Sequence, residues 1–476
     1  MKKHIIKSSV VLSVLLLSVS CDSIFEEVNQ SKNRPEDVTV DVLLAGAIYA
    51  QFDNYGGRLE GYMEPFVQRL SGIFGSSTNM DQYILDNSNF AYFFTGFYTG
   101  PLNSYKDIIA RGTEEESWHY VGAAKVMMAL ALGKLTDMYG EIPWSEALDP
   151  NNNFPAYDSQ ESIYMEIDRL LNEAVADLGK TSTRSLGDGD FILNGNTDAW
   201  IACAHLLAAR YANHLSKLDP QGSATKALTH VDAAKSSGIS STTDLKMKYE
   251  GNSQSLNRWN MLYNNNSMVA EKRFMDDLLA NDDPRLDAYF SEIDGQGRFT
   301  GFKGKPIGTG SQPGFFSAVN PNSWYAAPNS DHMVATYFEL LFIEAEAAFR
   351  SGDLLRAATA HNAAVREQIE LVVAAGDPRI APYLANFGNE TAATITMEKI
   401  MTEKWKATFT MSQETWTDMR RHDFAYPSFV EIPRFADGTP VAAEFIRRIL
   451  YPQDELDKNG EQVPDVTIFD RLWWDQ

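Results

Sequence analysis

The sequence places one cysteine where it could be chemically modified. Lys2, Lys3 and Lys7 precede an apolar run at residues 10–17, and small residues then lead to Cys21. A basic start, a short apolar run and small residues are typical of a secretory signal. The run is too short for a membrane-spanning helix, which needs roughly 20 apolar residues. We predict that cleavage makes Cys21 the first residue and that its thiol is acylated.

The residues before Cys21 resemble a lipobox, the motif at which bacterial lipoproteins are cut and diacylated. One position departs from the pattern, because Ser18 stands where leucine is usual and Leu17 lies one place earlier. The alternative is an ordinary signal peptide whose cut falls near a cysteine. Several acyl chains would hold firmly, since each buried CH2 contributes about 0.8 kcal/mol. We expect a signal peptide at 1–20, a lipidated tether at 21–37 and a single domain at 38–476.

The net charge disfavours two classes of partner, and the low number of cysteines rules out stabilisation by disulfide bonds if Cys21 is acylated. The formal net charge of −23 disfavours nucleic acid and anionic lipid surfaces as partners. If Cys21 is acylated, Cys203 remains alone and no disulfide can form, so a large core must stabilise the exported protein. We expect Cys203 to be a buried apolar residue rather than a nucleophile.

The motifs of common hydrolases and phosphate-binding proteins are missing or incomplete. There is no HExxH or GxSxG, and the glycine-rich residues 304–314 lack the Gly-Lys-Ser/Thr of a P-loop. Ser223 and Lys226 spell the S-x-x-K of serine-lysine acylases, but the helper motifs are absent. Ser223 fits better as the N-cap of a helix that begins there. We predict no catalytic activity.

One short polar stretch allows a metal hypothesis. Asp149, Asn151 and Asn153 have the one-three-five spacing of a calcium loop, but Phe154 replaces the required glycine and Gln160 the bidentate glutamate. A solvated turn is the alternative that this pattern favours. The eight histidines form no recognisable metal pair. We expect no cofactor, and a structural calcium ion is the alternative.

Two segments that do not show helical pairing contain the side chains best suited to bind a ligand. Residues 71–101 and 251–329 are rich in aromatic residues, Gly and Asn, and long loops on a rigid scaffold usually carry function. Aromatic rings can stack on the apolar faces of sugars while polar neighbours bond the hydroxyls. The alternative is that the rings fill the core beneath the loops. The candidate ligand-binding residues are Trp324, Tyr325, Trp259, Tyr83, Asn79, Asp81 and Asn322.

Elsewhere, apolar residues recur with helical periodicity in segments that come in pairs. We expect pairs at 114–139 with 159–178, 198–218 with 224–236, 332–350 with 354–371, and 395–409 with 414–421. In the third pair, Leu341, Ala345, Ala357 and Ala364 fit the tetratricopeptide pattern, whereas Glu344 and His361 do not. We predict a mostly α fold, in which tetratricopeptide-like helical pairs form a scaffold and loop-rich insertions carry a ligand face.

Four further segments carry a combination of residues that resembles one known family. They are Lys134–Trp144, Glu403–Ala407, Trp416–Arg421 and Arg447–Asn459. Together with the signal and Cys21 they resemble the SusD/RagB family of surface nutrient-binding lipoproteins. Trp416–Arg421 departs from the commoner Trp-Phe-Asp-Leu-Arg-Arg form. The resemblance implies a largely α-helical fold, but it supplies no ligand residues because no ligand motif can be matched position by position.

The resemblance also implies a biological role. Members of that family act as lids on SusC-type TonB-dependent transporters and hand over oligosaccharides or, in some branches, peptides. We therefore expect a lipid-anchored, surface-exposed outer-membrane protein that captures a nutrient, most readily an oligosaccharide, for a SusC-like transporter. A peptide-binding protein and a structural lid without its own ligand are the alternatives.

Overall fold

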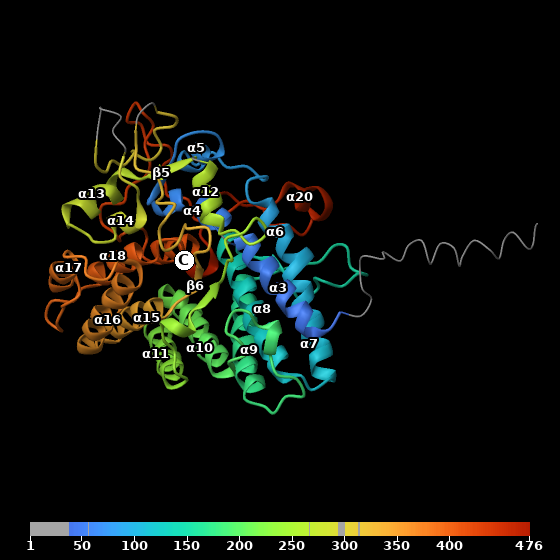
Figure 1. Ribbon diagram of the computed structural model, residues 1–476. Helices are drawn as coiled ribbons and strands as arrows, with labels where there is room; N and C mark the ends of the chain where they lie inside the picture. The colour runs from blue at the N-terminus through green and yellow to red at the C-terminus, as the bar shows by residue number, and fades with distance from the viewer. Residues whose placement is uncertain (1–37, 56, 266, 294–299, 313–314) are drawn as a thin grey trace, which may run out of the picture.

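The computed structural model describes residues 38–476, except 56, 266, 294–299 and 313–314 (Figure 1). The expected signal peptide, the tether and Cys21 lie outside the described residues. The described chain is mostly helical, as the sequence predicts, and its few short strands form two-stranded sheets. None of its described helices has both the length and the apolar character to cross a bilayer.

Three of the predicted helical pairs form the scaffold. α8 (Trp118–Tyr139) packs on α9 (Gln160–Leu178), α10 (Thr197–His214) on α11 (Pro220–Ser236), and α15 (Tyr337–Ser351) on α16 (Leu354–Val372). α9 also contacts α10, and α11 contacts α15, so the pairs stand side by side across the lower part of Figure 1. This array confirms the predicted scaffold of helical pairs.

Local sequence signals fix where these helices begin and end. Ser159 accepts a hydrogen bond from the Ser162 amide at the start of α9. Thr336 and Glu339 form a capping box at the start of α15. Such caps contribute about 1 kcal/mol each. Gly352 has a φ of 85° at the end of α15, a conformation that glycine adopts without strain and that permits the tight turn into α16.

Glycine residues let other helices approach α8 closely. A Cβ atom at Gly133 would overlap the Tyr211 ring of α10, and one at Gly122 would lie 2.6 Å from Leu178 Cγ of α9. Such overlap would force the helices apart and open cavities in the core. Because both positions are glycine, α8 can be buried on nearly all sides.

Several boundaries differ from the sequence prediction. α11 begins at Pro220 rather than 224, because Asp219 caps it by accepting from the Gly222 amide and proline suits the first turn. Ser223 therefore lies inside α11, and its predicted role as the cap is wrong. Residues 332–335, predicted as the start of a helix, form strand β6 (His332–Ala335), which pairs with β4 (Leu245–Met247).

The predicted fourth pair is not a simple helical hairpin. α18 (Met397–Ala407) packs on α15 and α16, whereas α19 (Ser412–Arg421) packs mainly on α4 (Gly57–Val67). α3 (Val40–Tyr55) and α7 (Asn103–Glu114), which the sequence analysis did not predict, cover α8 from the other side. The scaffold is therefore three pairs with additional helices on both flanks.

The two insertions contain regular structure and form one layer. The first includes β1 (Leu70–Gly72), α5 (Ser76–Asp81) and α6 (Ala91–Phe97), which runs into a π-helical turn at Tyr98–Leu102. The second includes α12 (Arg258–Asn265), β5 (Met268–Ala270), α13 (Lys272–Ala280) and α14 (Leu286–Tyr289). β1 pairs antiparallel with β5, so the insertions lie together above the scaffold (Figure 1).

The remaining elements are short and lie at the flanks. β2 (Ile142–Pro143) pairs with β3 (Tyr157–Asp158) just after α8. α17 (Ile380–Phe387) packs on α16, and α20 (Gln453–Asn459) lies near α6 at the upper right of Figure 1. α20 thus lies where the C-terminal part of the chain meets the first insertion.

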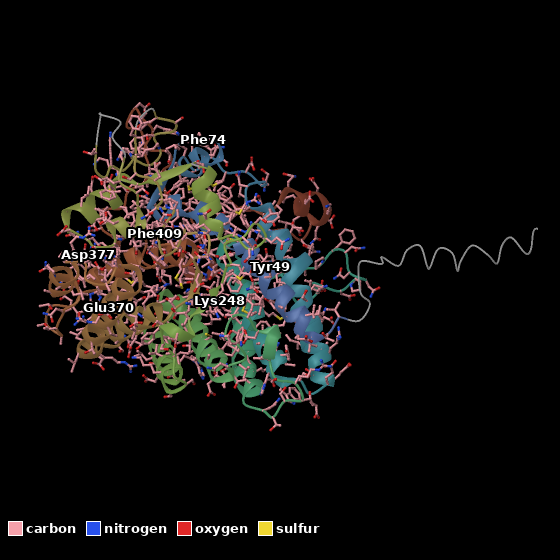
Figure 2. All side chains as sticks on the ribbon, in the orientation of Figure 1. Tyr49, Phe74, Lys248, Glu370, Asp377 and Phe409 are labelled. Carbon is pink, nitrogen blue, oxygen red and sulfur yellow. The ribbon has the colours of Figure 1, made fainter. Side chains whose placement is uncertain are left out.

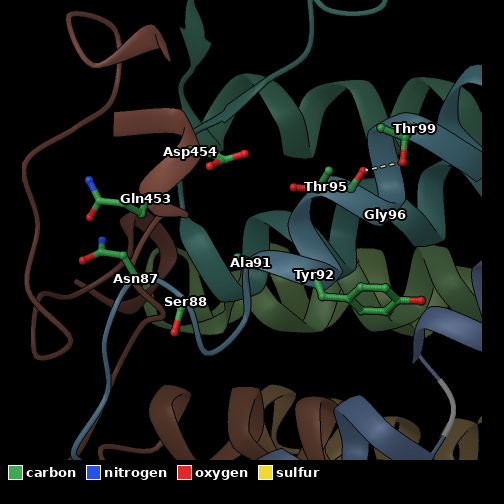
Figure 3. A pocket seen from close by; sticks show the side chains of 9 residues that line it. All are labelled: Asn87, Ser88, Ala91, Tyr92, Thr95, Gly96, Thr99, Gln453 and Asp454. Atoms are coloured by element: carbon green, nitrogen blue, oxygen red, sulfur yellow. Dashed lines mark hydrogen bonds between the residues drawn. The ribbon is translucent and has the colours of Figure 1, made fainter. Parts of the chain in front are cut away.

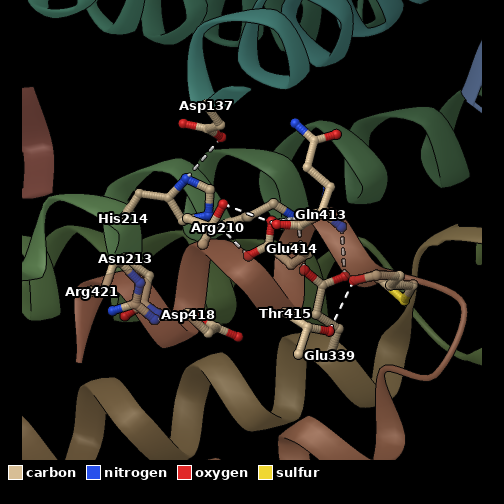
Figure 4. Close-up of polar contacts among 12 residues, drawn as sticks. Asp137, Arg210, Asn213, His214, Glu339, Gln413, Glu414, Thr415, Asp418 and Arg421 are labelled. Carbon is tan, nitrogen blue, oxygen red and sulfur yellow. Dashed lines mark hydrogen bonds and ion pairs between the residues drawn. The ribbon is translucent and has the colours of Figure 1, made fainter. Parts of the chain in front are cut away.

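Buried ion pairs connect the scaffold to α19 (Figure 4). Arg421 donates to both carboxylate oxygens of Glu346 on α15, at 2.8 and 2.9 Å. Arg210 of α10 donates to both oxygens of Glu339 on α15, each at 2.6 Å. All four side chains are at most 2% exposed. Because a buried charge is tolerated only with a well-placed partner, these pairs fix how α10, α15 and α19 sit together.

His214 of α10 extends this network to α8. Its Nε2 lies 2.9 Å from Glu414 Oε1, and its Nδ1 lies 3.4 Å from Asp137 Oδ2. In Figure 4 the imidazole stands between these two carboxylates. Burial opposes protonation of the ring, but the charges of Glu414 and Asp137 outweigh it and raise the pKa of His214 to about 9. The imidazole is therefore a cation at neutral pH.

We predict that Glu346→Ala lowers the free energy of unfolding by about 3–5 kcal/mol, because it removes a buried carboxylate that two arginines share. Arg350, 2.5 Å from Glu346, would lose this carboxylate, and Arg421 would keep Asp418 as its carboxylate partner. Denaturation in urea measures the loss. The control Glu370→Ala removes an acid that is 58% exposed and paired with Arg366, and it should change stability by at most about 0.5 kcal/mol. Equal losses in the two variants would contradict the prediction.

The raised pKa of His214 predicts a pH-dependent stability. The folded-state pKa of about 9 exceeds the ordinary value of 6.5. The cation therefore contributes stability that is complete below pH 6.5 and is lost as the pH rises through 9. Linkage sets this contribution at about 3 kcal/mol. Urea denaturation should show that the difference between wild type and His214→Gln shrinks between pH 6.5 and 9. A constant difference would be inconsistent with a protonated His214.

Candidate ligand-binding groove

α6 divides the aromatic residues of the first insertion between the core and the surface. Phe93, Phe94 and Phe97 follow helical spacing on one face and are at most 2% exposed. Tyr92 lies on the other side of the helix and is 50% exposed. Thr95 is also exposed, since it stands one turn away on the same side. The helix thus presents an aromatic ring and a hydroxyl to solvent.

A groove of about 420 Å³ runs between α6 and α20 (Figure 3). Tyr92 and the small residues of α6 form one side, α20 forms the other, and the loop before α6 closes one end. The lining residues are Asn87, Ser88, Ala91, Tyr92, Thr95, Gly96, Thr99, Gln453 and Asp454. Ala91 and Gly96 leave space beside the Tyr92 ring, since neither has a large side chain.

Contacts between distant segments shape the groove. The Asn87 side-chain amide donates to the Tyr451 carbonyl at 2.7 Å, and the Gln453 amide donates to the Asn87 carbonyl at 3.3 Å. The Tyr157 hydroxyl donates to Glu455 at 2.9 Å and holds α20 from the far side. The groove therefore exists only when the C-terminal segment is docked on the first insertion.

The Tyr92 ring is held in place by its neighbours. The guanidinium carbon of Arg58, in α4, lies over the ring at 4.9 Å from the centroid. Phe93 packs against it edge to face at a centroid distance of 5.6 Å. A cation–π contact at an exposed site contributes about 0.5–1 kcal/mol. The ring is thus supported while half of its surface stays open.

The groove combines one fixed aromatic ring with neutral amide and hydroxyl groups and one carboxylate. Amides and hydroxyls both donate and accept hydrogen bonds, and a carboxylate accepts. Such a set suits a ligand that has an apolar C–H face for the ring and several hydroxyl groups for the walls. These groups suit the recognition of such a ligand.

The residues considered for catalysis are engaged in structural contacts. Lys226 pairs with Asp168 at 2.7 Å, and the Ser223 hydroxyl donates to the Pro220 carbonyl at 3.3 Å. The two side chains of the S-x-x-K motif therefore have other partners.

The residues considered for calcium form a local turn. The Asp149 carboxylate accepts from the Asn151 amide at 2.9 Å and from its side chain at 3.1 Å. Within the described part of the chain, no three or more His, Cys, Asp or Glu side chains are grouped so that they could hold a metal ion.

Three of the four candidate aromatic residues lie in the core. Trp259 is 0% exposed, Tyr325 1% and Tyr83 7%. Trp259 and Tyr325 pack edge to face at 5.6 Å, and both contact Phe409, which follows α18. For these three rings the alternative left open by the sequence holds, because they complete the core beneath the insertions. Trp324 is half-buried beside Tyr325.

Asp81, predicted at the rim of a ligand site, instead joins the two insertions. Its carboxylate accepts from the Ser71 hydroxyl at 2.6 Å and the Gly72 amide at 2.9 Å, and lies 3.5 Å from Lys305 Nζ. Asp81 and Lys305 are both 0% exposed. Burial raises the pKa of Asp81 to about 6, although Lys305 opposes the rise. Its expected exposure is wrong, because the carboxylate is needed to hold the second insertion.

The other polar candidates have mixed positions. Asn322 is exposed and Asn79 is half-buried. Neither of them, and none of the other five candidates, lines the groove between α6 and α20. Trp324, Asn322 and Asn79 are therefore the candidates that keep solvent access outside the groove.

Most of the groove is not predictable from the sequence, although one part of it has a signal. The phenylalanines at 90, 93, 94 and 97 have helical spacing, which places Tyr92 on the opposite face. The Gly and Asn residues of the segment favour a loop, which has no such face, so the predicted site does not include Tyr92. No pattern within the sequence indicates that Gln453 and Asp454 lie beside α6.

A family model decides the relationship that this fold and groove suggest. The family model is named SusD-like, and its description reads "Starch-binding associating with outer membrane". It matches residues 32–452. The chain belongs to the SusD-like family. The resemblance seen in the sequence is thereby confirmed, and the family description links these proteins to starch and to the outer membrane.

Solved structures share the SusD-like fold over nearly the whole chain. A chitin-binding protein is 22% identical, with 92% of this chain and 100% of that chain covered and a TM-score of 0.76. A SusD/RagB family protein from Bacteroides thetaiotaomicron is 21% identical, with 92% and 99% covered and a TM-score of 0.75. A chitin-binding SusD homolog from Flavobacterium johnsoniae is 20% identical, with 91% and 98% covered and a TM-score of 0.73. At these identities the similarity establishes the fold. No curated protein matches the chain in sequence.

Proposed function

We propose that this SusD-like protein captures an oligosaccharide in the groove between α6 and α20 and delivers it to a SusC-type TonB-dependent transporter. In this proposal the chain is anchored by an acylated Cys21, faces the cell exterior at the outer membrane and catalyses no reaction. The observation that carries the proposal is the half-exposed Tyr92 ring in a groove of amides and hydroxyls.

The chemistry of the groove supports a saccharide ligand. A sugar ring can place its C–H face on Tyr92 while Asn87, Thr95 and Gln453 meet its hydroxyls. Because Arg58 and Phe93 already hold Tyr92, little side-chain entropy is lost on binding. Two of the similar structures are named as chitin-binding, which also favours a saccharide.

The transporter partner and the outer-membrane location rest on the family. Its description associates these proteins with the outer membrane, and the sequence around Cys21 resembles a lipoprotein signal. The net charge of −23 suits a body held away from an anionic surface by a tether. The family relationship indicates the role, whereas the class of ligand is inferred from the residues that line the groove.

We predict that Tyr92→Ala weakens oligosaccharide binding by about 1–3 kcal/mol, the range measured when a base loses an aromatic stacking partner. Screening on a glycan array identifies the best oligosaccharide, and calorimetry then compares the variants. The control is Phe74→Ala, which removes a ring that is also 50% exposed but lies outside the groove, near α5 (Figure 2). Phe74→Ala should bind like the wild type, and thermal unfolding should show both variants folded.

Other outcomes of this experiment point to other sites or roles. Unchanged affinity in Tyr92→Ala would place the ligand elsewhere, with Trp324 and Asn322 as the next residues to substitute. Binding on a peptide array but not on a glycan array would identify a peptide-binding protein. Silence on both arrays, combined with co-purification of a barrel protein, would indicate a structural lid.

We predict that Cys21→Ser abolishes lipidation and releases the protein from membranes, because the acyl chains attach through the thiol. Fractionation of cells that express each form should recover the wild type with outer membranes and the variant in soluble fractions. Mass spectrometry of the N-terminal peptide should find acyl chains on the wild type alone. Recovery of unacylated wild type from the cytosol would refute the anchor.

A further inference from the structure

The walls of the groove carry a single charge. Among the nine residues that line it, only Asp454, in the first turn of α20, is charged at neutral pH. The polar groups beside it are neutral amides and hydroxyls. Figure 3 shows the Asp454 carboxylate on α20, across the groove from α6. This carboxylate therefore attracts or repels the charged groups of any ligand that stacks on Tyr92.

Neighbouring groups leave the negative charge of this wall in place. Lys458 donates to Asp454 at 2.9 Å and offsets part of its charge, and both side chains are largely exposed. Glu455 and Asp457 add two more carboxylates to α20. At the end of the groove, Asp86 accepts from the Ser88 hydroxyl and amide, which lower its pKa and keep it ionised.

The cation on the opposite side does not face the groove. Arg58 lies over the Tyr92 ring, 4.9 Å from its centroid, and is not among the lining residues. A sugar stacked on the open face of Tyr92 therefore has the aromatic ring between itself and the guanidinium. No ring separates Asp454 from the ligand. The carboxylates of α20 therefore make the electrostatic potential in the groove negative.

We infer that the groove selects neutral or amino-bearing oligosaccharides over polyanionic ones such as uronic-acid chains, and that Asp454 sets this preference. The inference rests on the proposed function and names the substrate class of the same groove. A ligand carboxylate about 6 Å from Asp454, close to the protein surface, would lose affinity by about fivefold through repulsion alone. A protonated amine at that distance would gain a similar factor.

Two matched pairs of hexasaccharides test the inference. Hexagalacturonate and its full methyl ester share one backbone and differ in charge, as do the hexamers of glucosamine and N-acetylglucosamine. Calorimetry at low ionic strength compares the wild type with Asp454→Asn. The control Glu370→Gln makes the same change in net charge far from the groove, on α16 (Figure 2).

We expect the wild type to bind the free acid about tenfold more weakly than its ester, and the amine at least as tightly as its acetylated form. Asp454→Asn should reduce the ratio of the acid's Kd to the ester's Kd about fivefold, whereas Glu370→Gln should leave this ratio unchanged. High salt should also reduce the wild-type ratio, because the Debye length falls from about 10 Å at 0.1 M to about 3 Å at 1 M.

Equal or tighter binding of the free acid by the wild type would overturn the inference. Equal acid-to-ester Kd ratios in Asp454→Asn and Glu370→Gln would overturn it as well. Tyr92→Ala separates this failure from failure of the proposed function. If it weakens binding of the uncharged hexamers while the charge preference is absent, only the selectivity is refuted. If the folded wild type binds none of the four hexamers, the selectivity is refuted, and the glycan array still decides the proposed function. If Tyr92→Ala binds the hexamers as the wild type does, both proposals fail.

Discussion

The pairing of buried arginines with glutamates constrains how the layers of this protein fit together. Glu346 of α15 accepts from Arg421 of α19, from Arg350 one turn away and from Asn213 of α10. Removing one partner of such a set leaves an uncompensated charge in a medium that solvates it poorly. The helices that supply these partners must therefore dock together or not at all. The scaffold pairs and α19 consequently behave as one unit, and α4 is positioned by its packing on α19.

The same constraint extends to the insertions and to the C-terminal segment. Asp81 and Lys305 are buried together and tie the second insertion to the first. The Trp474 indole donates to Asp137 at 3.0 Å, and Asp475 pairs with Arg447 at 2.6 Å, so the last residues are fixed to α8 and to the segment before α20. Because Arg447 lies six residues before Gln453, this anchoring also positions the groove wall.

Apolar residues at helical spacing, together with local start and stop signals, were sufficient to predict that the three scaffold pairs exist. It could not predict the burial of Trp259 and Tyr325, because both rings pack on Phe409, which is distant in the sequence. Residue type alone does not distinguish a ring that binds a ligand from one that fills a core. Asp81 shows the same limit for polar residues, since its role depends on a lysine 224 positions away. Helical spacing could have predicted the exposed face of α6, but nothing in the sequence predicts that α20 forms the opposite wall of the groove.

The groove shows how one short helix can serve both stability and recognition. Phe93, Phe94 and Phe97 bury one face of α6 in the core, whereas Tyr92 and Thr95 on the other face contribute little to it. On α20, Asp454 is likewise exposed, while the helix is held through Glu455 and the backbone of Gln453. A substitution at Tyr92, Thr95 or Asp454 therefore changes the chemistry of the groove without opening a cavity or leaving a buried charge unpaired. It follows that ligand preference can change on this scaffold while the contacts that fix the fold stay the same.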